Sequence, residues 1–230
     1  MEAIVLAGGF GTRLKQLVPH LPKPMALVAG RPFLEILLSS LERKGFRRVV
    51  LSLGYMAEKI VEYFGDHFNN VVLVYEIEKK PLGTGGAVRQ ALERCHSDHV
   101  YVFNGDTYLD LEVDQVESFW REHRAPLIVA REVSDTSRYG RLNVKEGRII
   151  DFAEKKSSGP GLINSGSYVF PKHLFDDFSC GRKFSLETDF LSKRVRNEHF
   201  SFFVSKGFFI DIGFPEDLVR AQTALAGLGF

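Results

Sequence analysis

Cysteine is scarce in this chain of 230 residues, which contains two of them, Cys95 and Cys180. The two cysteines form no metal-binding or redox motif with each other, so the sequence predicts neither a disulfide framework nor a redox centre. We therefore expect both residues to be reduced thiols in a cytoplasmic protein.

Long apolar runs and a large net charge are also missing. No run of about 18 or more uncharged apolar residues occurs, as a membrane-spanning helix would require. The first ten residues, MEAIVLAGGF, lack the basic start and the long apolar stretch of a signal peptide,. The net charge is +1, and the 30 basic residues are spread along the chain. We therefore expect neither a membrane nor a nucleic acid as a partner.

Apolar residues are abundant: hydrophobic residues make up 44% of the chain, and 20 of them are phenylalanines. This composition is sufficient for a substantial core, and the length suits a single domain over residues 1–230,. Within it the pattern of elements changes after about residue 132. We therefore expect two halves, at about residues 1–132 and about residues 133–230.

The first half alternates apolar strands with amphipathic helices. The predicted strands are Glu2–Ala7, Arg48–Leu53, Val71–Tyr75, His99–Asn104 and Leu127–Glu132. The predicted helices are Phe33–Lys44, Ala57–Phe64, Gly85–Arg94 and Val113–Glu122. Alternation of this kind, with strands that are nearly all apolar, predicts a parallel sheet covered by helices on both faces. The fold class is therefore α/β and Rossmann-like, with a mixed, mostly parallel sheet.

The second half is less regular. We expect a hairpin, further strands and two helices there, at Arg141–Val144 with Arg148–Phe152, Ile163–Phe170, Leu186–Val195, Phe200–Val204, Phe208–Asp211 and Pro215–Leu228. In open α/β sheets, ligands bind at the carboxyl ends of the strands. Candidate site residues are therefore sought at Gly8–Arg13, Gly105–Asp106 and Asp211.

A glycine-rich turn, LAGGFGTRL, follows the first predicted strand. Such a turn lets backbone N–H groups approach phosphates, and Arg13 adds a guanidinium that can bind phosphate oxygens. The turn is neither a Walker A loop, because no Gly-Lys-Ser/Thr follows, nor a dinucleotide fingerprint, because Leu14 occupies the third glycine position. The candidate nucleotide-binding residues here are Leu6, Ala7, Gly8, Gly9, Gly11, Thr12 and Arg13.

A lysine between two prolines follows shortly afterwards, in Leu21-Pro22-Lys23-Pro24-Met25. The prolines hold the segment extended, so Lys23 can present a fixed positive charge to a triphosphate. Together with Gly-Gly-x-Gly-Thr-Arg-Leu, this Pro-Lys-Pro resembles the consensus of the sugar-1-phosphate nucleotidyltransferases. The resemblance covers nearly the whole chain and implies the fold of nucleotide-diphospho-sugar transferases. It also implies a first half that binds the nucleotide and a second half that binds the sugar phosphate.

The third motif, Glu78-Lys79-Lys80-Pro81-Leu82-Gly83-Thr84-Gly85-Gly86-Ala87, concerns the base. An ionised carboxylate only accepts hydrogen bonds, and guanine offers two adjacent donors. Glu78 therefore favours guanine, and guanylyltransferases of the family resemble this chain in having glutamate before Pro-Leu-Gly-Thr. Glu76 is an alternative for the same role. The further candidate nucleotide-binding residues are Lys23, Glu78, Pro81, Gly83, Thr84 and Gly105.

Two aspartates come at predicted strand ends, Asp106 after Asn104-Gly105 and Asp211 in Phe-Ile-Asp-Ile-Gly. Carboxylates at such positions suit a hard divalent cation, although either residue could instead be a helix cap. They match the paired metal-binding aspartates of the family, which implies that Asp106 and Asp211 hold Mg²⁺.

The resemblance also implies a sugar-phosphate site. Its predicted residues are Asp106, Tyr139, Gly140, Glu154, Lys155, Asn164 and Glu187. In the family, the Glu-Lys pair lies in this site, so Lys155 would hold the phosphate and Glu154 a sugar hydroxyl. Glu187 could instead be a first-turn glutamate that is favoured by a helix dipole.

The implied reaction is attack by a sugar 1-phosphate oxygen on the α-phosphorus of GTP, with release of pyrophosphate. A phosphate with a second pKa of about 6 is largely ionised near neutral pH, so no general base is required. The obstacle is repulsion between anions, which positive charge relieves. The predicted catalytic residues are therefore Arg13, Lys23, Asp106 and Lys155.

The sugar is less well defined by the sequence. The guanylyltransferases that the chain resembles act on mannose 1-phosphate or on D-glycero-D-manno-heptose 1-phosphate. The Pro-Leu-Gly-Thr-Gly-Gly-Ala form is similar to that of the bacterial heptose enzymes, and the short chain lacks the second domain of many mannose enzymes. The resemblance therefore implies heptose 1-phosphate and GDP-heptose synthesis for a bacterial capsule or surface polysaccharide. Mannose 1-phosphate is the alternative, followed by an amino-sugar 1-phosphate with UTP. A non-catalytic regulatory subunit of the same fold and a retaining glycosyltransferase are alternatives from other classes. A homo-oligomer is possible.

Overall fold

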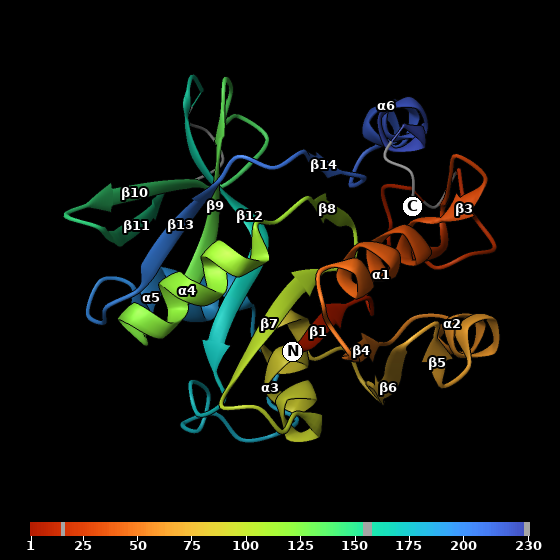
Figure 1. Cartoon of the computed structure of the whole chain (residues 1–230), viewed down its shortest axis with the longest axis horizontal. Helices are drawn as coiled ribbons and strands as arrows, with labels where there is room; N and C mark the ends of the chain where they lie inside the picture. The colour runs from red at the N-terminus through yellow and green to blue at the C-terminus, as the bar shows by residue number, and fades with distance from the viewer. Residues whose placement is uncertain (15–16, 154–157, 228–230) are drawn as a thin grey trace.

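A ten-stranded mixed sheet forms the centre of the computed structural model, which describes residues 1–14, 17–153 and 158–227 (Figure 1). Its strand order is β10-β11-β13-β9-β12-β7-β1-β4-β6-β5. The bounds of these strands, in chain order, are β1 Glu2–Leu6, β4 Arg48–Leu53, β5 His67–Phe68, β6 Val71–Ile77, β7 His99–Asn104, β9 Leu127–Val133, β10 Arg141–Lys145, β11 Arg148–Ala153, β12 Gly161–Pro171 and β13 Ser201–Ser205.

Most strands of this sheet point in one direction. The strands β7, β1, β4 and β6 pair in parallel, as do β9 and β13. The strands β12, β11 and β5 run against their neighbours. The predicted mixed, mostly parallel α/β sheet is therefore confirmed, and its parallel centre is the apolar part of the first half.

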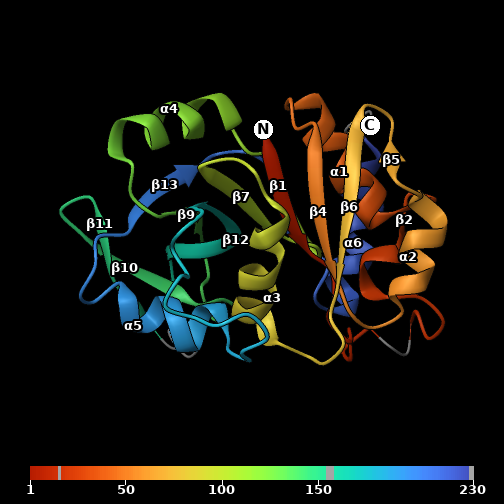
Figure 2. The ribbon, with the colours of Figure 1, turned by 90° about the horizontal axis from the view of Figure 1, so that it is seen from below.

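Helices cover both faces of the sheet (Figure 2). One face packs against α1 (Phe33–Arg43), α2 (Ala57–Phe64) and α4 (Val113–His123), whose apolar residues share one core with the odd-numbered residues of β1. The other face packs against α3 (Gly83–Ala91) and the segment that includes α5 (Ser192–Arg194). Successive side chains of a strand point to opposite faces, so burial on both faces explains why β1 is apolar throughout.

Several helix ends differ from the predictions by one or two residues, and two helices differ more. The helix α3 begins at Gly83 rather than Gly85, and a 3-10 turn, Leu92–Arg94, follows it. The predicted helix Leu186–Val195 begins as a π-helical segment, Leu186–Leu191, and ends in the short α5. Ser185 directly precedes the π segment, and its side chain accepts a hydrogen bond from the Thr188 backbone N–H. Wider helical turns of this kind often occur at functional sites.

One predicted strand belongs to a different sheet. The strand β14 (Phe209–Asp211) pairs antiparallel with β8 (Thr107–Leu109), a strand that the sequence analysis missed because it follows Asp106 directly. Two other short strands that were not predicted, β2 (Leu27–Val28) and β3 (Arg31–Pro32), form a hairpin. The preceding Lys23–Met25 is a 3-10 turn, so the expectation of an extended segment around Lys23 was wrong. The helix α6 (Pro215–Ala226) packs over this region in a third apolar cluster. These connections bring the end of the chain back to the first strands.

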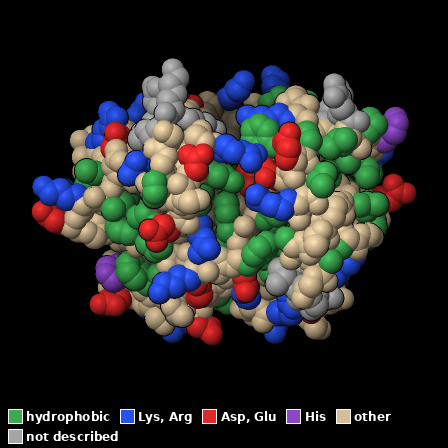
Figure 3. All heavy atoms as spheres, turned by 90° about the horizontal axis from the view of Figure 1, so that it is seen from above, with side chains coloured by type: hydrophobic (Ala, Val, Ile, Leu, Met, Phe, Trp, Pro, Cys, Tyr) green, Lys and Arg blue, Asp and Glu red, His purple; other side chains and the backbone are tan. Residues whose placement is uncertain are grey.

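The surface does not concentrate one sign of charge on the face shown in Figure 3, where basic and acidic side chains are interspersed. Within the described part of the chain, no helix has both the length and the apolarity that crossing a lipid bilayer requires.

Candidate active site

The carboxyl ends of β1 and β7 lie side by side, because Leu6 and Asn104 are partners in the parallel register. A cavity of about 330 Å³ lies at this edge. The residues that line it are Leu6, Ala7, Gly8, Gly9, Phe10, Lys23, Pro24, Ser52, Glu78, Pro81, Gly83, Thr84, Ala87, Asn104, Gly105 and Asp106. We call it the first pocket. It brings together most of the predicted nucleotide-binding residues.

The glycine-rich turn is tightly packed against the Pro-Lys-Pro segment. Gly11 has a φ of +58°, and a Cβ added there would lie 2.8 Å from the Cβ of Lys23. A larger residue at position 11 would therefore displace Lys23 as well as strain the backbone. Gly11 and Thr12 do not line the first pocket, so their predicted contact with the nucleotide stays a prediction.

Lys23 and Asp106 form an ion pair between two motifs that are far apart in the sequence. The Nζ atom of Lys23 lies 2.5 Å from Oδ2 of Asp106, and their side chains are 14% and 36% exposed. The Asp106 carboxylate therefore binds the Lys23 ammonium group and is still accessible to a ligand.

Asp211 is the second acidic group at this place. The antiparallel pairing of β14 with β8 sets Asp211 opposite Thr107, and the Ile212 backbone N–H donates to the carbonyl oxygen of Asp106 at 2.9 Å. Burial, and next the charge of Asp106, raise the pKa of Asp211. A carboxylate whose ionisation is disfavoured by a neighbouring negative charge lies where a cation is stabilised.

A second cavity, of about 190 Å³, adjoins the first. Its lining residues are Arg13, Asn104, Asp106, Thr107, Arg138, Tyr139, Gly140, Asn164, Ser165, Gly166, Glu187, Phe209, Asp211 and Phe214. Both cavities share Asn104 and Asp106. This second pocket brings together predicted sugar-phosphate residues from four separate segments, and it meets the first pocket at Asn104 and Asp106, beside Lys23.

Arg13 is the residue whose location differs most from the expectation. The sequence assigned it to the nucleotide, but in the structure it lines the second pocket and does not line the first. Its guanidinium carbon lies 4.6 Å from the centre of the Phe214 ring. The glycine-rich turn therefore borders both pockets, with backbone facing the first and its arginine facing the second.

Glu78 and Glu76 are distinguished by their neighbours. The Glu76 carboxylate accepts hydrogen bonds from Gln90 at 2.5 Å and from Arg94 at 2.8 Å, and it does not line either pocket. Glu78 lines the first pocket, where one carboxylate oxygen accepts the Leu82 backbone N–H at 2.9 Å. Burial raises the pKa of Glu78. Of the two glutamates, only Glu78 can contact a base in this pocket.

Asn164 and Glu187 contact each other at the second pocket. The amide of Asn164 donates to Glu187 at 3.0 Å and to the Tyr168 hydroxyl at 2.8 Å. Glu187 comes from the π-helical segment, whereas Asn164 comes from β12, so the two residues join different elements. Such a pair offers both a donor and an acceptor to hydroxyl groups.

A family model described as nucleotidyl transferase matches residues 2–227, almost the whole chain. The chain belongs to the nucleotidyl transferase family. The predicted family and enzyme class are therefore confirmed.

Two bacterial relatives of this nucleotidyltransferase match over nearly their full length. It is 39% identical over 226 residues to the D-glycero-alpha-D-manno-heptose 1-phosphate guanylyltransferase of Aneurinibacillus thermoaerophilus, covering 98% of both chains. It is 40% identical over 218 residues to the Campylobacter jejuni protein of the same name, covering 94% of this chain and 96% of the relative.

A solved structure is similar as well. The crystal structure of HddC from Yersinia pseudotuberculosis has a TM-score of 0.88 and 38% identity, and covers 97% of this chain and 99% of that one. The structure of HddC complexed with GMP-PN has a TM-score of 0.87. The fold of the nucleotidyltransferase is thus that of its relatives.

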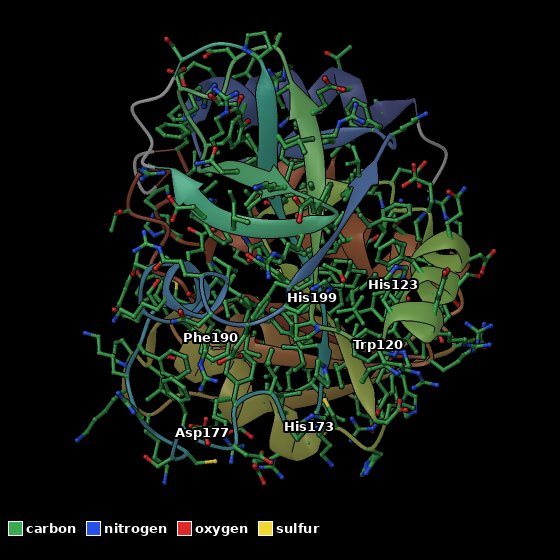
Figure 4. All side chains as sticks on the ribbon, turned by 90° about the vertical axis from the view of Figure 1, so that its left-hand side faces the viewer. Trp120, His123, His173, Asp177, Phe190 and His199 are labelled. Carbon is green, nitrogen blue, oxygen red and sulfur yellow. The ribbon has the colours of Figure 1, made fainter. Side chains whose placement is uncertain are left out.

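A divalent cation is compatible with the residues of this nucleotidyltransferase. Within residues 1–14, 17–153 and 158–227, no group of three or more histidine, cysteine and acidic side chains gathers as a complete protein cage. Figure 4, for example, shows His173 apart from His123 and His199, so these three histidines do not form a common metal site. Magnesium is bound by one or two carboxylates together with substrate phosphates and water. Asp106 and Asp211 provide such a pair, so the donor set fits Mg²⁺ better than a metal with histidine or thiolate ligands.

Other site residues were missed or lie outside the described part of the chain. Glu154 and Lys155 are in the latter group, so their predicted roles stay predictions. Asn104, Arg138 and Phe214 line the pockets but were not predicted as site residues. Asn104 directly precedes Gly105-Asp106, so its place at the strand end could have indicated it. Nothing in the sequence next to Arg138 or Phe214 indicated a place at the site, because their contacts are with residues that are distant in sequence.

Proposed function

We propose that this chain transfers a guanylyl group from GTP to D-glycero-α-D-manno-heptose 1-phosphate, giving GDP-heptose and pyrophosphate. The observation that carries the proposal is the junction of the two pockets at Asn104 and Asp106. A nucleotide in the first pocket and a sugar phosphate in the second would meet beside the Lys23–Asp106 pair. The two similar relatives named as heptose 1-phosphate guanylyltransferases support this choice of substrates.

The chemistry requires neutralisation of charge rather than removal of a proton. The attacking phosphate is largely ionised near neutral pH, so it can approach the α-phosphorus without a general base. Lys23 would hold the triphosphate where the two pockets meet, and Arg13 would supply a second positive charge from the second pocket. Lys155 would hold the sugar phosphate. Preorganised cations of this kind are effective because they need no rearrangement as negative charge moves to pyrophosphate.

Asp106 and Asp211 would hold Mg²⁺ in this proposal. When bound, the ion would supply positive charge to the phosphate oxygens. The raised pKa of Asp211 supports the assignment, because a cation between the two carboxylates would favour their ionised forms,.

We further propose one nucleotidyltransferase domain with a nucleotide-binding half to about residue 132 and a sugar-phosphate-binding half beyond it. The first pocket draws on the first half, whereas the second pocket draws on both. The expected cytoplasmic location, a role in capsule or surface polysaccharide synthesis, and a homo-oligomer stay predictions.

A pyrophosphate-release assay with magnesium tests the function. The assay combines GTP, ATP, CTP, UTP and dTTP with heptose 1-phosphate and with mannose 1-phosphate. Turnover with GTP and heptose 1-phosphate is the expected result. Turnover with GTP and mannose 1-phosphate alone would change the proposed sugar substrate but leave the proposed reaction in place. No turnover in any combination would favour a non-catalytic subunit.

Recognition of the base can be tested by replacing Glu78 with glutamine. We expect kcat/KM for GTP to fall about 10–100-fold, because a hydrogen bond to a charged group contributes about 1.5–3 kcal/mol. ITP lacks the guanine amino group and can donate only one of the two bonds. The preference for GTP over ITP should therefore decrease in E78Q, measured as the ratio of the two kcat/KM values.

The matched control for this prediction is Glu76→Gln. Glu76 lies two residues earlier, and its carboxylate contacts Gln90 and Arg94 rather than the first pocket. The E76Q variant should retain the wild-type ratio of GTP to ITP, whatever happens to its stability. An unchanged ratio in E78Q would show that Glu78 does not contact the base.

A further inference from the structure

The ring of Phe214 contacts two arginines at the edge of the second pocket. The guanidinium carbons of Arg13 and Arg138 each lie 4.6 Å from the centre of this ring. A guanidinium at this distance is attracted by the negative face of an aromatic ring. The three residues come from distant parts of the chain, so the contact depends on the tertiary structure.

Arg138 is tied to a buried carboxylate, whereas Arg13 is not. One guanidinium nitrogen of Arg138 lies 3.4 Å from Oδ1 of Asp217, and another makes a closer contact with Oδ2. Asp217 is 2% exposed, and its hydrogen bond raises the pKa of Arg138. Among the residues that the structure describes, Arg13 forms no ion pair with a carboxylate. Asp217 also lies 3.4 Å from Arg220, so it compensates the charge of Arg138 in part, whereas the charge of Arg13 is available to an anion.

The backbone of Phe214 is anchored at the start of α6. The carbonyl oxygen of Phe214 accepts the backbone N–H groups of Asp217 and Leu218, each at 3.1 Å, at the start of α6. Leu218, with Ala221 and Leu225, buries the apolar side of this helix in the third cluster. Arg13, by contrast, lies in a glycine-rich turn and is exposed. The backbone that carries the ring is thus anchored at the start of α6, whereas the backbone that carries Arg13 belongs to the glycine-rich turn.

A long exposed side chain loses rotamer freedom when it binds an anion, and a side chain that is already held loses less. The contact of the Arg13 guanidinium with the Phe214 ring, which we call the stack, holds Arg13 at the second pocket. Asp106 and Asp211 also line this pocket. The charge of Arg13 is thereby kept close to the place where the two pockets meet.

We propose that Phe214 is a positioning residue for nucleotidyl transfer, which holds the Arg13 guanidinium ready for a phosphate group, with Arg138 and Asp217 fixing the ring. This inference rests on the proposed function for its kinetic consequences. The contact itself is a property of the free protein and can be tested without turnover.

The kinetic test is a double-mutant cycle between Phe214 and Arg13. We expect F214L to lower kcat/KM about tenfold, within the range of one cation–π contact, and F214Y to retain nearly wild-type values. If Phe214 acts through Arg13, adding F214L to R13A should cause no further loss. A full tenfold loss in the R13A background would overturn the inference.

The matched control is Phe178→Leu. Arg182 lies 4.7 Å from the centre of the Phe178 ring, so this is the same kind of pair outside the two pockets. The F178L variant should keep kcat/KM unchanged. An equal loss in F178L and F214L would show a general effect of removing a ring and would contradict the proposal.

A measurement on the free protein separates this inference from the proposed function. In ¹⁵N-labelled protein, the Arg13 Nε–H resonance is assigned by its disappearance in R13K. We expect the ring current of Phe214 to displace this resonance in the wild type, and F214L to return it toward the position of a free arginine. If the resonance has the same position in the wild type and in F214L, the contact between Arg13 and Phe214 is overturned, even if the wild type is fully active. Absence of pyrophosphate release from the wild type would overturn the function, and the resonance would still decide the stack.

Discussion

Replacing Lys23 with alanine is expected to lower kcat by about 10²–10³, the loss typical of removing one preorganised charge or donor. Lys23 Nζ lies 2.5 Å from Asp106 Oδ2 at the first pocket, so in the proposal its charge faces the reacting phosphates. The measurement is single-turnover pyrophosphate release with saturating GTP and sugar 1-phosphate.

Lys44→Ala is the matched control for K23A. Lys44 also pairs with an aspartate, Asp110, at 2.6 Å, but this pair lies outside both pockets. The K44A variant should keep kcat, and both variants should keep a cooperative thermal transition, which would show that a change in kcat is not due to unfolding. Wild-type turnover in K23A would refute the assignment of the active site.

Asp106→Asn should lower turnover by a similar factor of about 10²–10³, for a different physical reason. Asparagine keeps the shape of the side chain but removes the charge that pairs with Lys23 and, in the proposal, binds Mg²⁺. Asp106 also lines both pockets, so one substitution affects the nucleotide and the sugar phosphate together. Steady-state kinetics over a range of magnesium concentrations should show a lower kcat and a higher magnesium concentration at half-maximal rate.

The control for D106N is Asp110→Asn, which removes the carboxylate of the Lys44 pair four residues later in the chain. The D110N variant should retain the kcat and the magnesium dependence of the wild type. If D106N did the same, neither the metal site nor the meeting point of the pockets would be as proposed.

Local sequence patterns predicted the parallel centre of the sheet and most of the first pocket. An apolar strand followed by glycines requires burial on both faces and a tight turn, so β1 and the turn after it could be predicted from adjacent residues alone. The same is true of β7, whose apolar run ends at Asn104 before Gly105 and Asp106. Such features depend on side-chain polarity and backbone freedom within a few residues.

Short strands and helix types were harder to predict. The strand β8 begins one residue after Asp106 and exists because β14 pairs with it. Pairing of this kind joins Thr107 to Asp211 across more than a hundred residues, and no local pattern encodes it. The π-helical turn at Leu186–Leu191 similarly depends on packing against α3, which a periodicity of 3.6 cannot reveal,.

The sequence by itself determined the family and the α/β fold class, and it predicted residues for phosphate, base and metal, because these depend on motifs of adjacent residues. Only the tertiary structure decided which glutamate faces the first pocket, since Glu76 and Glu78 lie on the same segment and differ in their distant neighbours. The contact between the Arg13 guanidinium and the Phe214 ring was also visible only in the tertiary structure, because the neighbours of a long flexible side chain determine its direction,.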